Sequence, residues 1–315
     1  MTLHQPVMLN EVLDALQPAS KALIIDATFG RGGYSRAILE AGDGMVMAID
    51  RDPDAIAAGA LLSAEYDGRL TVMEGPFSTM LNLARGAGIT AADAIVFDLG
   101  LSSPQLDEAE RGFSFRHDGP LDMRMEKSGL NAADFINTAT ETEIARVIWE
   151  FGEERASRRI ARAIVKARTE APITRTTQLA TIIRSVMPRP KPGQIDPATR
   201  SFQGIRIHIN GELDEISAAL EAAEQLLKPG GQLVVVSFHS LEDRLVKNFM
   251  ITRSGQGPRP SRHRPDVERP TPSFSLERRK PVLPSETETA TNPRARSARM
   301  RVATRTDAPA MKEVA

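Results

Sequence analysis

The chain has 315 residues, of which 41% are apolar and 26% charged, and it contains no cysteine. At about 150 residues per domain, this length predicts roughly two domains with a well-buried core. The lack of cysteine excludes disulfides, thiolate-bound zinc or iron–sulfur clusters and a cysteine nucleophile. No stretch reaches the ~18 apolar residues of a membrane-spanning helix, and no signal peptide is evident, so we expect a cytoplasmic protein without a membrane partner.

The net charge of −1 conceals four blocks of alternating sign. Residues 1–145 carry a net charge of −12, 146–206 of +8, 207–250 of −4 and 251–315 of +7. Basic blocks on an acidic body are typical of proteins with a polyanionic partner such as nucleic acid, although solvated helix faces can produce the same counts.

Apolar runs that indicate buried strands alternate with helical stretches in the first hundred residues. These runs are 22–26, 45–50, 70–74 and 94–98, and the first helices are expected over about 34–41 and 53–64. Such alternation predicts a doubly wound, mainly parallel sheet that is covered on both faces.

The alternation stops after Asp98 and returns about a hundred residues later. The polar segment 101–130 predicts a loop, and 131–206 shows helical periodicity without a convincing strand. A helix over about 207–227 then precedes a fifth strand at 232–237, and Ser240 is expected to cap another helix. We therefore expect an α/β domain formed by 1–105 and 207–315, interrupted by a linker and an all-helical insertion domain at 106–206.

The end of the chain is rich in proline and charge. Residues 254–295 predict an extended or mobile loop, and 274–277 and 297–302 are candidates for two late strands.

A glycine-rich loop follows the first predicted strand. It is the segment Asp26-Ala27-Thr28-Phe29-Gly30-Arg31-Gly32-Gly33-Tyr34-Ser35. Glycines at this place allow a tight turn and close approach of a ligand. Asp50 ends the second strand, where a carboxylate can accept hydrogen bonds from both hydroxyls of a ribose. These features together predict an adenosine-containing cofactor.

Two residues favour S-adenosylmethionine (SAM) over NAD. Ser35 stands where the dinucleotide fingerprint has its third glycine or alanine. The carboxylate of Asp26 would repel a pyrophosphate, whereas in SAM enzymes it helps to hold the methionine end. The chain has no Gly-x-x-x-x-Gly-Lys-Ser/Thr phosphate loop, which argues against an NTPase.

Further short motifs occur in a fixed order along nearly the whole chain. They include His4-x-Pro6-Val7-Met8-Leu9, Ala48-Ile49-Asp50-Arg51-Asp52, Gly75-Pro76-Phe77, Asp98-Leu99-Gly100-Leu101-Ser102-Ser103-Pro104-Gln105, Arg111-Gly112-Phe113-Ser114-Phe115, Gly119-Pro120-Leu121-Asp122-Met123-Arg124-Met125, Phe151-Gly152-Glu153-Glu154, Ser237-Phe238-His239-Ser240-Leu241-Glu242-Asp243-Arg244 and Asn292-Pro293-Arg294-Ala295-Arg296-Ser297. Each is weak alone, but the ordered set closely resembles the MraW family, the ribosomal RNA small-subunit methyltransferase H enzymes.

The resemblance implies a Rossmann-like class I SAM-dependent methyltransferase. It implies methyl transfer to N4 of one cytosine, conventionally numbered 1402, of 16S rRNA near the P site of the small ribosomal subunit. Carried over by motif, the SAM contacts fall on Gly32, Gly33, Tyr34, Asp50, Phe77, Asp98 and Gln105, with Asp26 as an additional candidate. Many members have His in place of Tyr34, a difference that matters only if the side chain touches SAM.

The N4 amine of cytosine is a weak nucleophile because its lone pair is delocalised into the ring. Acceptors for its hydrogens would make the nitrogen more pyramidal, and Asp98 and Ser102 are the candidate catalytic residues. Many amino methyltransferases carry Asp/Asn-Pro-Pro-Tyr/Phe where this chain has Asp98-Leu99-Gly100-Leu101, so Asp98 either binds SAM, orients the amine, or does both. Methylation at C5 of a pyrimidine is excluded because it requires a thiolate. Five dispersed histidines predict no catalytic metal.

Two basic sets are candidates for RNA contact. Arg155, Arg159, Arg162 and Lys166 have the spacing of one helix face, beside an apolar face of Ala156, Ile160, Ala163 and Ala167. The second set is Arg294, Arg296, Arg299 and Arg301. His239 follows the fifth strand and is a candidate for contact with the target base or RNA, although a structural role is equally expected. Phe113, Phe115 and Met123 are candidates for stacking, with core packing as the commoner fate.

Three alternatives stay open on the sequence alone. One is an amino methyltransferase that acts on DNA or protein, and another is an NAD-dependent oxidoreductase, which the Ser35 mismatch disfavours. The third is a SAM-binding RNA assembly factor without turnover. A homodimer is possible, but the sequence does not indicate the oligomeric state.

Overall fold

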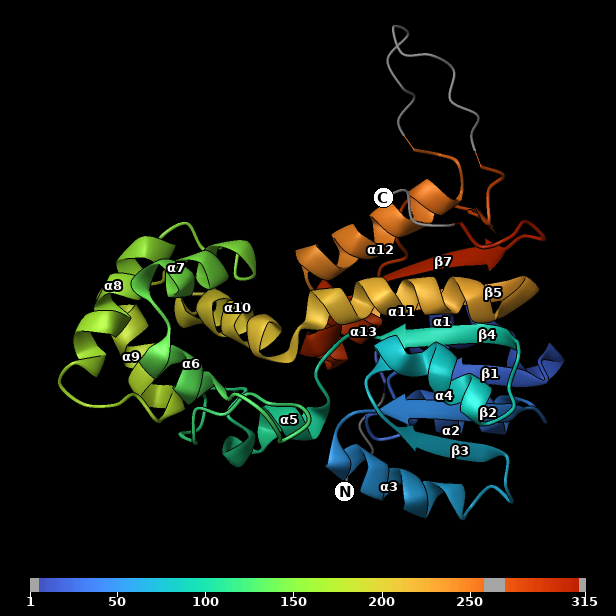
Figure 1. Ribbon diagram of the computed structural model, residues 1–315, viewed down its shortest axis with the longest axis horizontal. Coiled ribbons are helices and arrows are strands. Elements are labelled where there is room, and N and C mark those ends of the chain that lie inside the picture. Colours follow the sequence, from blue (N-terminus) through green and yellow to red (C-terminus); the bar gives the residue numbers. More distant parts are fainter. Residues whose placement is uncertain (1–5, 258–269, 312–315) are drawn as a thin grey trace, which may run out of the picture. The chain divides into compact units, whose positions relative to one another are not determined.

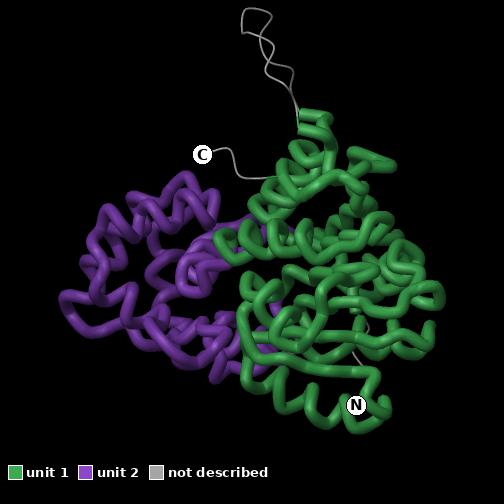
Figure 2. The backbone as a smooth tube through the Cα atoms, turned by 45° about the vertical axis from the view of Figure 1, so that its right-hand side comes forward, with its two compact units in different colours: residues 1–100, 213–315 green, residues 101–212 purple. Residues whose placement is uncertain are grey.

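The protein, seen in a computed structural model that describes residues 6–257 and 270–311, forms two compact units (Figure 2). Unit 1 comprises 1–100 and 213–315, and unit 2 comprises 101–212. His4 and the middle of the expected proline-rich loop, residues 258–269, lie outside the described residues.

Unit 1 is built on a seven-stranded sheet of order β3-β2-β1-β4-β5-β7-β6 (Figure 1). Its strands are β1 (Leu23–Asp26), β2 (Met45–Asp50), β3 (Leu70–Glu74), β4 (Ala92–Asp98), β5 (Leu227–Ser237), β6 (Phe274–Ser275) and β7 (Arg299–Arg305). The first five run parallel, and β7 pairs antiparallel with both β5 and β6. The predicted Rossmann-like, mainly parallel sheet is confirmed, and β5 begins five residues earlier than expected.

Helices cover both faces of this sheet because each buried strand presents alternate side chains to opposite sides. Ile24, Val46 and Val96 face the helices α1 (Leu9–Leu16), α2 (Gly33–Ala41) and α3 (Pro53–Ser63). Ile25, Met47 and Phe97 face α4 (Met80–Gly86), α11 (Glu212–Leu226) and α12 (Ser240–Arg253). The shorter elements are η1 (Pro18–Ser20), η2 (Phe77–Thr79), α13 (Glu286–Thr291) and η4 (Pro293–Ser297).

The chain order changes direction between β1 and β4. From β1 it proceeds outward through β2 to β3, whereas from β4 it continues to β5 on the other side. In open α/β sheets, ligands bind outside the carboxyl ends of the strands at such a switch point. The fold therefore places the candidate site beside Asp26 and Asp98, which end β1 and β4.

The regular secondary structure of unit 2 is helical apart from one isolated bridge, between Pro120 and Arg175. Its helices are α5 (Ser103–Asp107), η3 (Ala109–Arg111), α6 (Ala132–Thr138), α7 (Glu141–Glu150), α8 (Ser157–Arg168), α9 (Thr176–Ser185) and α10 (Ala198–Asn210). Ile144, Ile160 and Ile183 lie in its separate apolar core. The single helix expected over 207–227 is wrong, because Gly211, with φ of 60°, ends α10 and α11 begins at Glu212.

The polar segment expected as a loop at 101–130 is tightly held within unit 2. The buried guanidinium of Arg111 donates to the carbonyls of Arg124 and Met125 at 3.1 and 3.0 Å. Asn210 donates to the carbonyl of Met123 and accepts from the amide of Met125, both at 2.8 Å. Met123 is fully buried, so it belongs to the core of the unit.

Two phenylalanines of the same segment also pack inward. Phe113 is buried, and the ring of Phe115 lies 4.7 Å from the ring of Phe202 in α10. Core packing thus accounts for both. Across the two described ranges, no helix is long and apolar enough to cross a membrane.

Candidate active site

The glycine-rich loop packs tightly against neighbouring side chains at Gly32 and Gly33. Gly32 caps α2 with φ of 75°, a conformation that side chains other than glycine rarely adopt. A Cβ atom at Gly32 would lie 2.6 Å from a methyl carbon of Leu62, and one at Gly33 would overlap Pro6. The first amides of α2 have no partner carbonyl within the helix, as at any helix N-terminus, and such ends bind anionic groups well.

Asp50 fastens this loop to the end of β2. Its Oδ2 accepts a hydrogen bond from the Gly30 amide at 2.7 Å, and its Oδ1 accepts from the Asp52 amide at 2.8 Å. Burial raises the pKa of Asp50 above its ordinary value. A carboxylate oxygen can accept more than one bond, so the predicted ribose contacts are compatible with this arrangement. The structural role of Asp50 in the loop was not predicted.

Asp26 is fully buried at the end of β1. It accepts hydrogen bonds from the Ser35 hydroxyl at 2.6 Å and from the Thr28 amide at 3.2 Å. Burial raises its pKa to about 6, and the Ser35 bond opposes that rise. The Thr28 hydroxyl in turn accepts from the Asp98 amide at 2.6 Å, which joins the ends of β1 and β4.

Asp98 has an incompletely satisfied carboxylate. Its Oδ1 is buried and has no hydrogen-bond partner among the described residues. Burial, with the nearby charges of Asp26 and Glu242, raises the pKa of Asp98 to about 7. Buried polar atoms normally have a partner, so this oxygen indicates a place for a ligand donor.

The Tyr34 side chain points into the core of unit 1. It is buried, and its hydroxyl donates to the carbonyl of Val7. Burial, with the charges of Asp98 and Asp26 next in importance, raises the pKa of Tyr34 well above its ordinary value. The ring of Tyr34 is therefore packed in the core and does not project from the glycine-rich loop toward the strand ends.

The remaining predicted cofactor residues lie in different units. Phe77, in η2 of unit 1, is partly buried and sets its ring edge-on to Phe97 at 5.9 Å. Gln105 lies in unit 2, where its Oε1 accepts from the Ser102 amide at 3.0 Å and caps α5. The cofactor contacts of Phe77 and Gln105, and the catalytic role of Ser102, stay predictions.

His239, rather than the predicted Ser240, is the N-cap of α12. Its Nδ1 accepts from the Glu242 amide at 3.4 Å, and its Nε2 lies 2.9 Å from Glu242 Oε1. Glu242 is buried and accepts from the amides of Phe238 and His239 at 2.8 and 3.1 Å. This reciprocal capping fixes the turn after β5. The Phe238 ring also lies against Gly100, where an added Cβ would come within 2.8 Å of it.

The first basic set is not one helix face as expected. Arg159, Arg162 and Lys166 are exposed on α8, but Arg155 precedes the helix, which begins at Ser157. The buried face consists of Ser157, Ile160, Ala161 and Ile164 instead of the predicted alanine-rich stripe. Exposed Arg158 is an addition that the spacing argument missed.

The second basic set is divided by the structure. Arg299 and Arg301 lie on one side of β7, as predicted, but both form ion pairs with Asp243, at 3.2 and 2.6 Å. Their assignment as RNA contacts is therefore wrong for Arg301, whose side chain is only 9% exposed. Arg294 and Arg296 lie in η4, and Arg296 is exposed.

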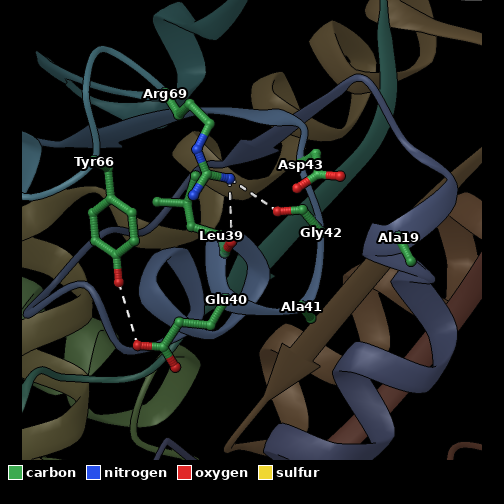
Figure 3. A pocket seen from close by; sticks show the side chains of 8 residues that line it. All are labelled: Ala19, Leu39, Glu40, Ala41, Gly42, Asp43, Tyr66 and Arg69. Carbon is green, nitrogen blue, oxygen red and sulfur yellow. Dashed lines mark hydrogen bonds between the residues drawn. The ribbon is translucent and has the colours of Figure 1, made fainter.

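A separate hollow of about 440 Å³ lies near the end of α2 (Figure 3). Arg69 there donates to the carbonyls of Leu39 and Gly42, and Tyr66 donates to Glu40. Because α2 begins at the carboxyl edge of the sheet and ends at the opposite one, this hollow is remote from Asp26 and Asp98. Its hydrogen bonds serve the helix C-terminus.

The residues at the carboxyl edge of unit 1 fit SAM. The amides at the start of α2 suit the methionine carboxylate, Asp50 suits the ribose, and Asp98 Oδ1 has no donor within the described part of the chain. No pyrophosphate would be expected beside the carboxylate of Asp26.

Comparison with known proteins agrees with this reading. Residues 1–306 match the MraW methylase family. A relative from Azorhizobium caulinodans is 58% identical, with 98% of this chain and 88% of the relative covered. Relatives from Methylocella silvestris and Rhodopseudomonas palustris are 56% and 54% identical, with 98% of this chain and 89% and 92% of the relatives covered. All three are named ribosomal RNA small subunit methyltransferase H. The chain therefore belongs to the MraW methylase family, and its cofactor is SAM.

Proposed function

We propose that the protein methylates N4 of one cytosine in 16S rRNA, at position 1402 near the P site of the small ribosomal subunit. The names of relatives that are 54–58% identical support the RNA substrate. The buried, unsatisfied Oδ1 of Asp98 at the end of β4 is the observation that carries the chemistry. The reaction would take place in the cytoplasm, on small-subunit particles.

The glycine-rich loop and the strand ends hold the cofactor in this proposal. Main-chain amides of Gly32, Gly33 and Tyr34 receive its carboxylate, and Asp50 accepts from its ribose. Phe77 and Gln105 are further contacts, and Asp26 supports the methionine end through the loop. When bound, SAM supplies an electrophilic methyl group.

Asp98 orients the amine that is to be methylated. Its Oδ1 accepts one N4 hydrogen, which directs the nitrogen lone pair away from the ring and toward the methyl group. Because its pKa is about 7, the carboxylate is partly ionised near neutral pH and can accept this bond. The methylated amine is acidic and loses its proton readily, so no strong base is required. Proximity and alignment then provide most of the rate enhancement, with Ser102 as a second candidate acceptor.

The exposed basic surface of unit 2 binds rRNA phosphates in this proposal. Arg155, Arg159, Arg162 and Lys166 are all exposed. Arg159 donates to the sulfur of Met187 at 3.5 Å, and Arg162 lies 3.7 Å from Glu141, so neither is strongly neutralised. Arg294, Arg296 and His239 are the additional RNA candidates in unit 1.

The reaction is tested on small subunits from cells that lack the gene. The purified protein is incubated with these particles and methyl-labelled SAM, and the digested RNA is analysed by mass spectrometry. We expect labelled N4-methylcytidine with the natural protein and a loss of about a hundredfold or more with Asp98→Ala, which removes the acceptor oxygen. Glu65→Ala, which removes an exposed carboxylate of the same unit, is the matched control and should behave as the natural protein does.

The nucleoside that carries the label distinguishes the proposed reaction from its alternatives. Label on another nucleoside would retain the methyltransferase and reject the cytosine assignment. SAM binding without any labelled RNA would favour an assembly factor that does not turn over. Full activity of Asp98→Ala would reject Asp98 as the orienting residue.

The RNA surface is tested by the salt dependence of particle binding. Replacing Arg155, Arg159, Arg162 and Lys166 by Gln should weaken binding to the small-subunit particles. The slope of the logarithm of the association constant against the logarithm of the salt concentration should become smaller by up to about 3. Arg85→Gln, an exposed control in unit 1, should leave the slope unchanged. An unchanged slope in the fourfold variant would reject this surface.

A further inference from the structure

The only tryptophan of the chain, Trp149, lies near the end of α7 in unit 2. It is 54% exposed, whereas Ile144, Val147 and Ile148 of the same helix are fully buried. Trp149 therefore does not serve the core of unit 2. Neither the predicted RNA surface nor the proposed chemistry makes use of it.

The side of α7 that carries Trp149 borders α8. Glu141 and Trp149 are eight residues apart, with Ala145 halfway, and this spacing places them along one side of a helix. Glu141 Oε1 lies 3.7 Å from Arg162 Nε, so this side faces α8. Only six residues, 151–156, connect the two helices. The end of α7 with Trp149 is consequently close to the beginning of α8.

Cations that lack a strong acidic partner lie just before α8 and on the first half of that helix. Arg155 and Arg158 are exposed, and neither has an acidic group within 4 Å among the residues that the structure describes. The side chain of Arg162 is 78% exposed and makes only the long contact with Glu141. Arg146, three residues before Trp149 and on the same side of α7, pairs with Glu150 at 2.7 Å and is therefore not one of these cations.

We propose that Trp149, Arg155, Arg158 and Arg162 form a binding surface for a single-stranded segment of rRNA. Tryptophan stacks on an unpaired base, and the arginines contact the phosphates on either side of that base. An exposed aromatic ring beside unneutralised cations is the chemistry by which proteins bind single-stranded nucleic acid. A protein partner would be expected to need apolar surroundings at Trp149, or to present acidic groups of its own to the arginines. The local excess of arginine instead favours RNA.

This inference rests on the proposed function, because it takes rRNA as the substrate, but it can be tested apart from methyl transfer. Trp149 is the only tryptophan, so the indole emission of the unmodified protein reports on this surface alone. Titration with a twelve-nucleotide oligocytidylate should quench the emission, and added salt should reverse the quenching. Trp149→Leu should weaken binding, measured with a labelled oligonucleotide, by about tenfold or more.

Two variants separate stacking from a general change in the surface. Trp149→Phe retains an aromatic ring and should restore most of the affinity. Ile195→Ala, which removes another exposed apolar side chain of unit 2, should leave affinity unchanged. Equal affinity of Trp149→Leu and the natural protein would overturn the inference. A dimer of the natural protein that Trp149→Leu dissociates in sedimentation would also overturn it, because the surface would then bind a second copy.

Methylation of small subunits distinguishes failure of the inference from failure of the proposed function. If the natural protein produces N4-methylcytidine, Trp149→Leu should raise KM for the particles with little change in kcat. An unchanged KM would reject the Trp149 surface and leave the reaction intact. Absence of any methylated cytidine with the natural protein would reject the proposed function and, with it, the assignment of this surface to the substrate.

Discussion

The hydroxyl of Ser35 donates a 2.6 Å hydrogen bond to the carboxylate of Asp26, and both residues are fully buried. In the sequence, Asp26 and Ser35 are two separate arguments against NAD. The structure shows that the two departures from a dinucleotide site are one contact. A serine is small enough for α2 to approach β1 closely, and its hydroxyl stabilises the acid at the end of that strand.

Removal of this hydroxyl should cost stability in a pH-dependent manner. Ser35→Ala leaves the ionised Asp26 with one donor fewer in a buried place, which should lower the free energy of unfolding by about 1–3 kcal/mol at pH 8. Burial already raises the pKa of Asp26 to about 6, and loss of the bond raises it further. Protonation therefore relieves the penalty, and urea unfolding at pH 5 should show a smaller difference.

The matched control is the same substitution in an Asp26→Asn background. With the charge removed, Ser35→Ala should cost similar amounts at pH 5 and pH 8. A pH-independent cost in the natural background would show that Ser35 contributes through packing rather than through the acid.

The buried carboxylate of Asp98 should lower the free energy of unfolding, even though the proposed reaction uses it. Its pKa of about 7 exceeds the value of 3.8 expected in the unfolded chain, so the folded state loses stability as pH rises from about 4 to above 7. Asp98→Asn removes that charge and should raise the free energy of unfolding at pH 8 by on the order of 1–2 kcal/mol.

Thermal unfolding in the absence of SAM gives the measurement. The gain in stability from Asp98→Asn should be smaller at pH 5, where Asp98 of the natural protein is protonated. The affinity of the variant for SAM should be lower than that of the natural protein at every pH. A destabilised Asp98→Asn protein at pH 8 would contradict the raised pKa.

The sheet could be predicted from sequence because its parallel strands are buried on both faces. Their apolar runs, such as Met45–Asp50, contrast sharply with the helices between them. The position of Asp98 follows from this pattern, since a strand that ends in an acid places that acid at the carboxyl edge. The break at Gly211 was missed because apolar periodicity continues across it, and only the positive φ separates the two helices.

Local sequence patterns could not predict which side chains pair with one another. Arg301 and Asp243 are 58 residues apart, so spacing could not show that the arginine is neutralised. The ring of Tyr34 was equally ambiguous, because a residue in the first turn of a helix can face either the ligand or the core. Trp149 was overlooked since neither a motif nor a charge run includes it.

The Tyr34 hydroxyl should matter for stability and not for cofactor binding. Tyr34→Phe leaves the carbonyl of Val7 without this donor, which should cost about 1 kcal/mol in urea unfolding. SAM affinity, measured by calorimetry, should change less than twofold because the ring of Tyr34 is buried and the contact proposed for this residue is through its main chain.

Tyr34→His, which introduces the residue that the family resemblance leads us to expect here, provides a second comparison. It should be less stable than Tyr34→Phe, since an imidazole fills the buried space poorly, yet it should bind SAM with similar affinity. A tenfold change in SAM affinity with full stability would show that the side chain contacts the cofactor.

Asp243 pairs with one buried and one exposed arginine, and removing each of them should change the free energy of unfolding by a different amount. Arg301 and Asp243 are each 9% exposed as side chains, whereas Arg299 is 47% exposed. Arg301→Ala should lower the free energy of unfolding by about 3 kcal/mol because Asp243 is left buried with only a partial partner. Arg299→Ala should cost less than about 1 kcal/mol, as expected for an exposed pair.

The pH dependence gives the same pair a second test. Burial alone would raise the pKa of Asp243, but hydrogen bonds from Arg301 and Arg299 and their charges hold it below its ordinary value. The stability that this carboxylate provides should therefore be present above pH 4 and be lost as pH falls further. In Arg301→Ala that loss should begin at a higher pH. If both alanine variants unfolded at the same urea concentration at pH 7, the difference in burial would have no energetic consequence and the buried pair would not anchor β7.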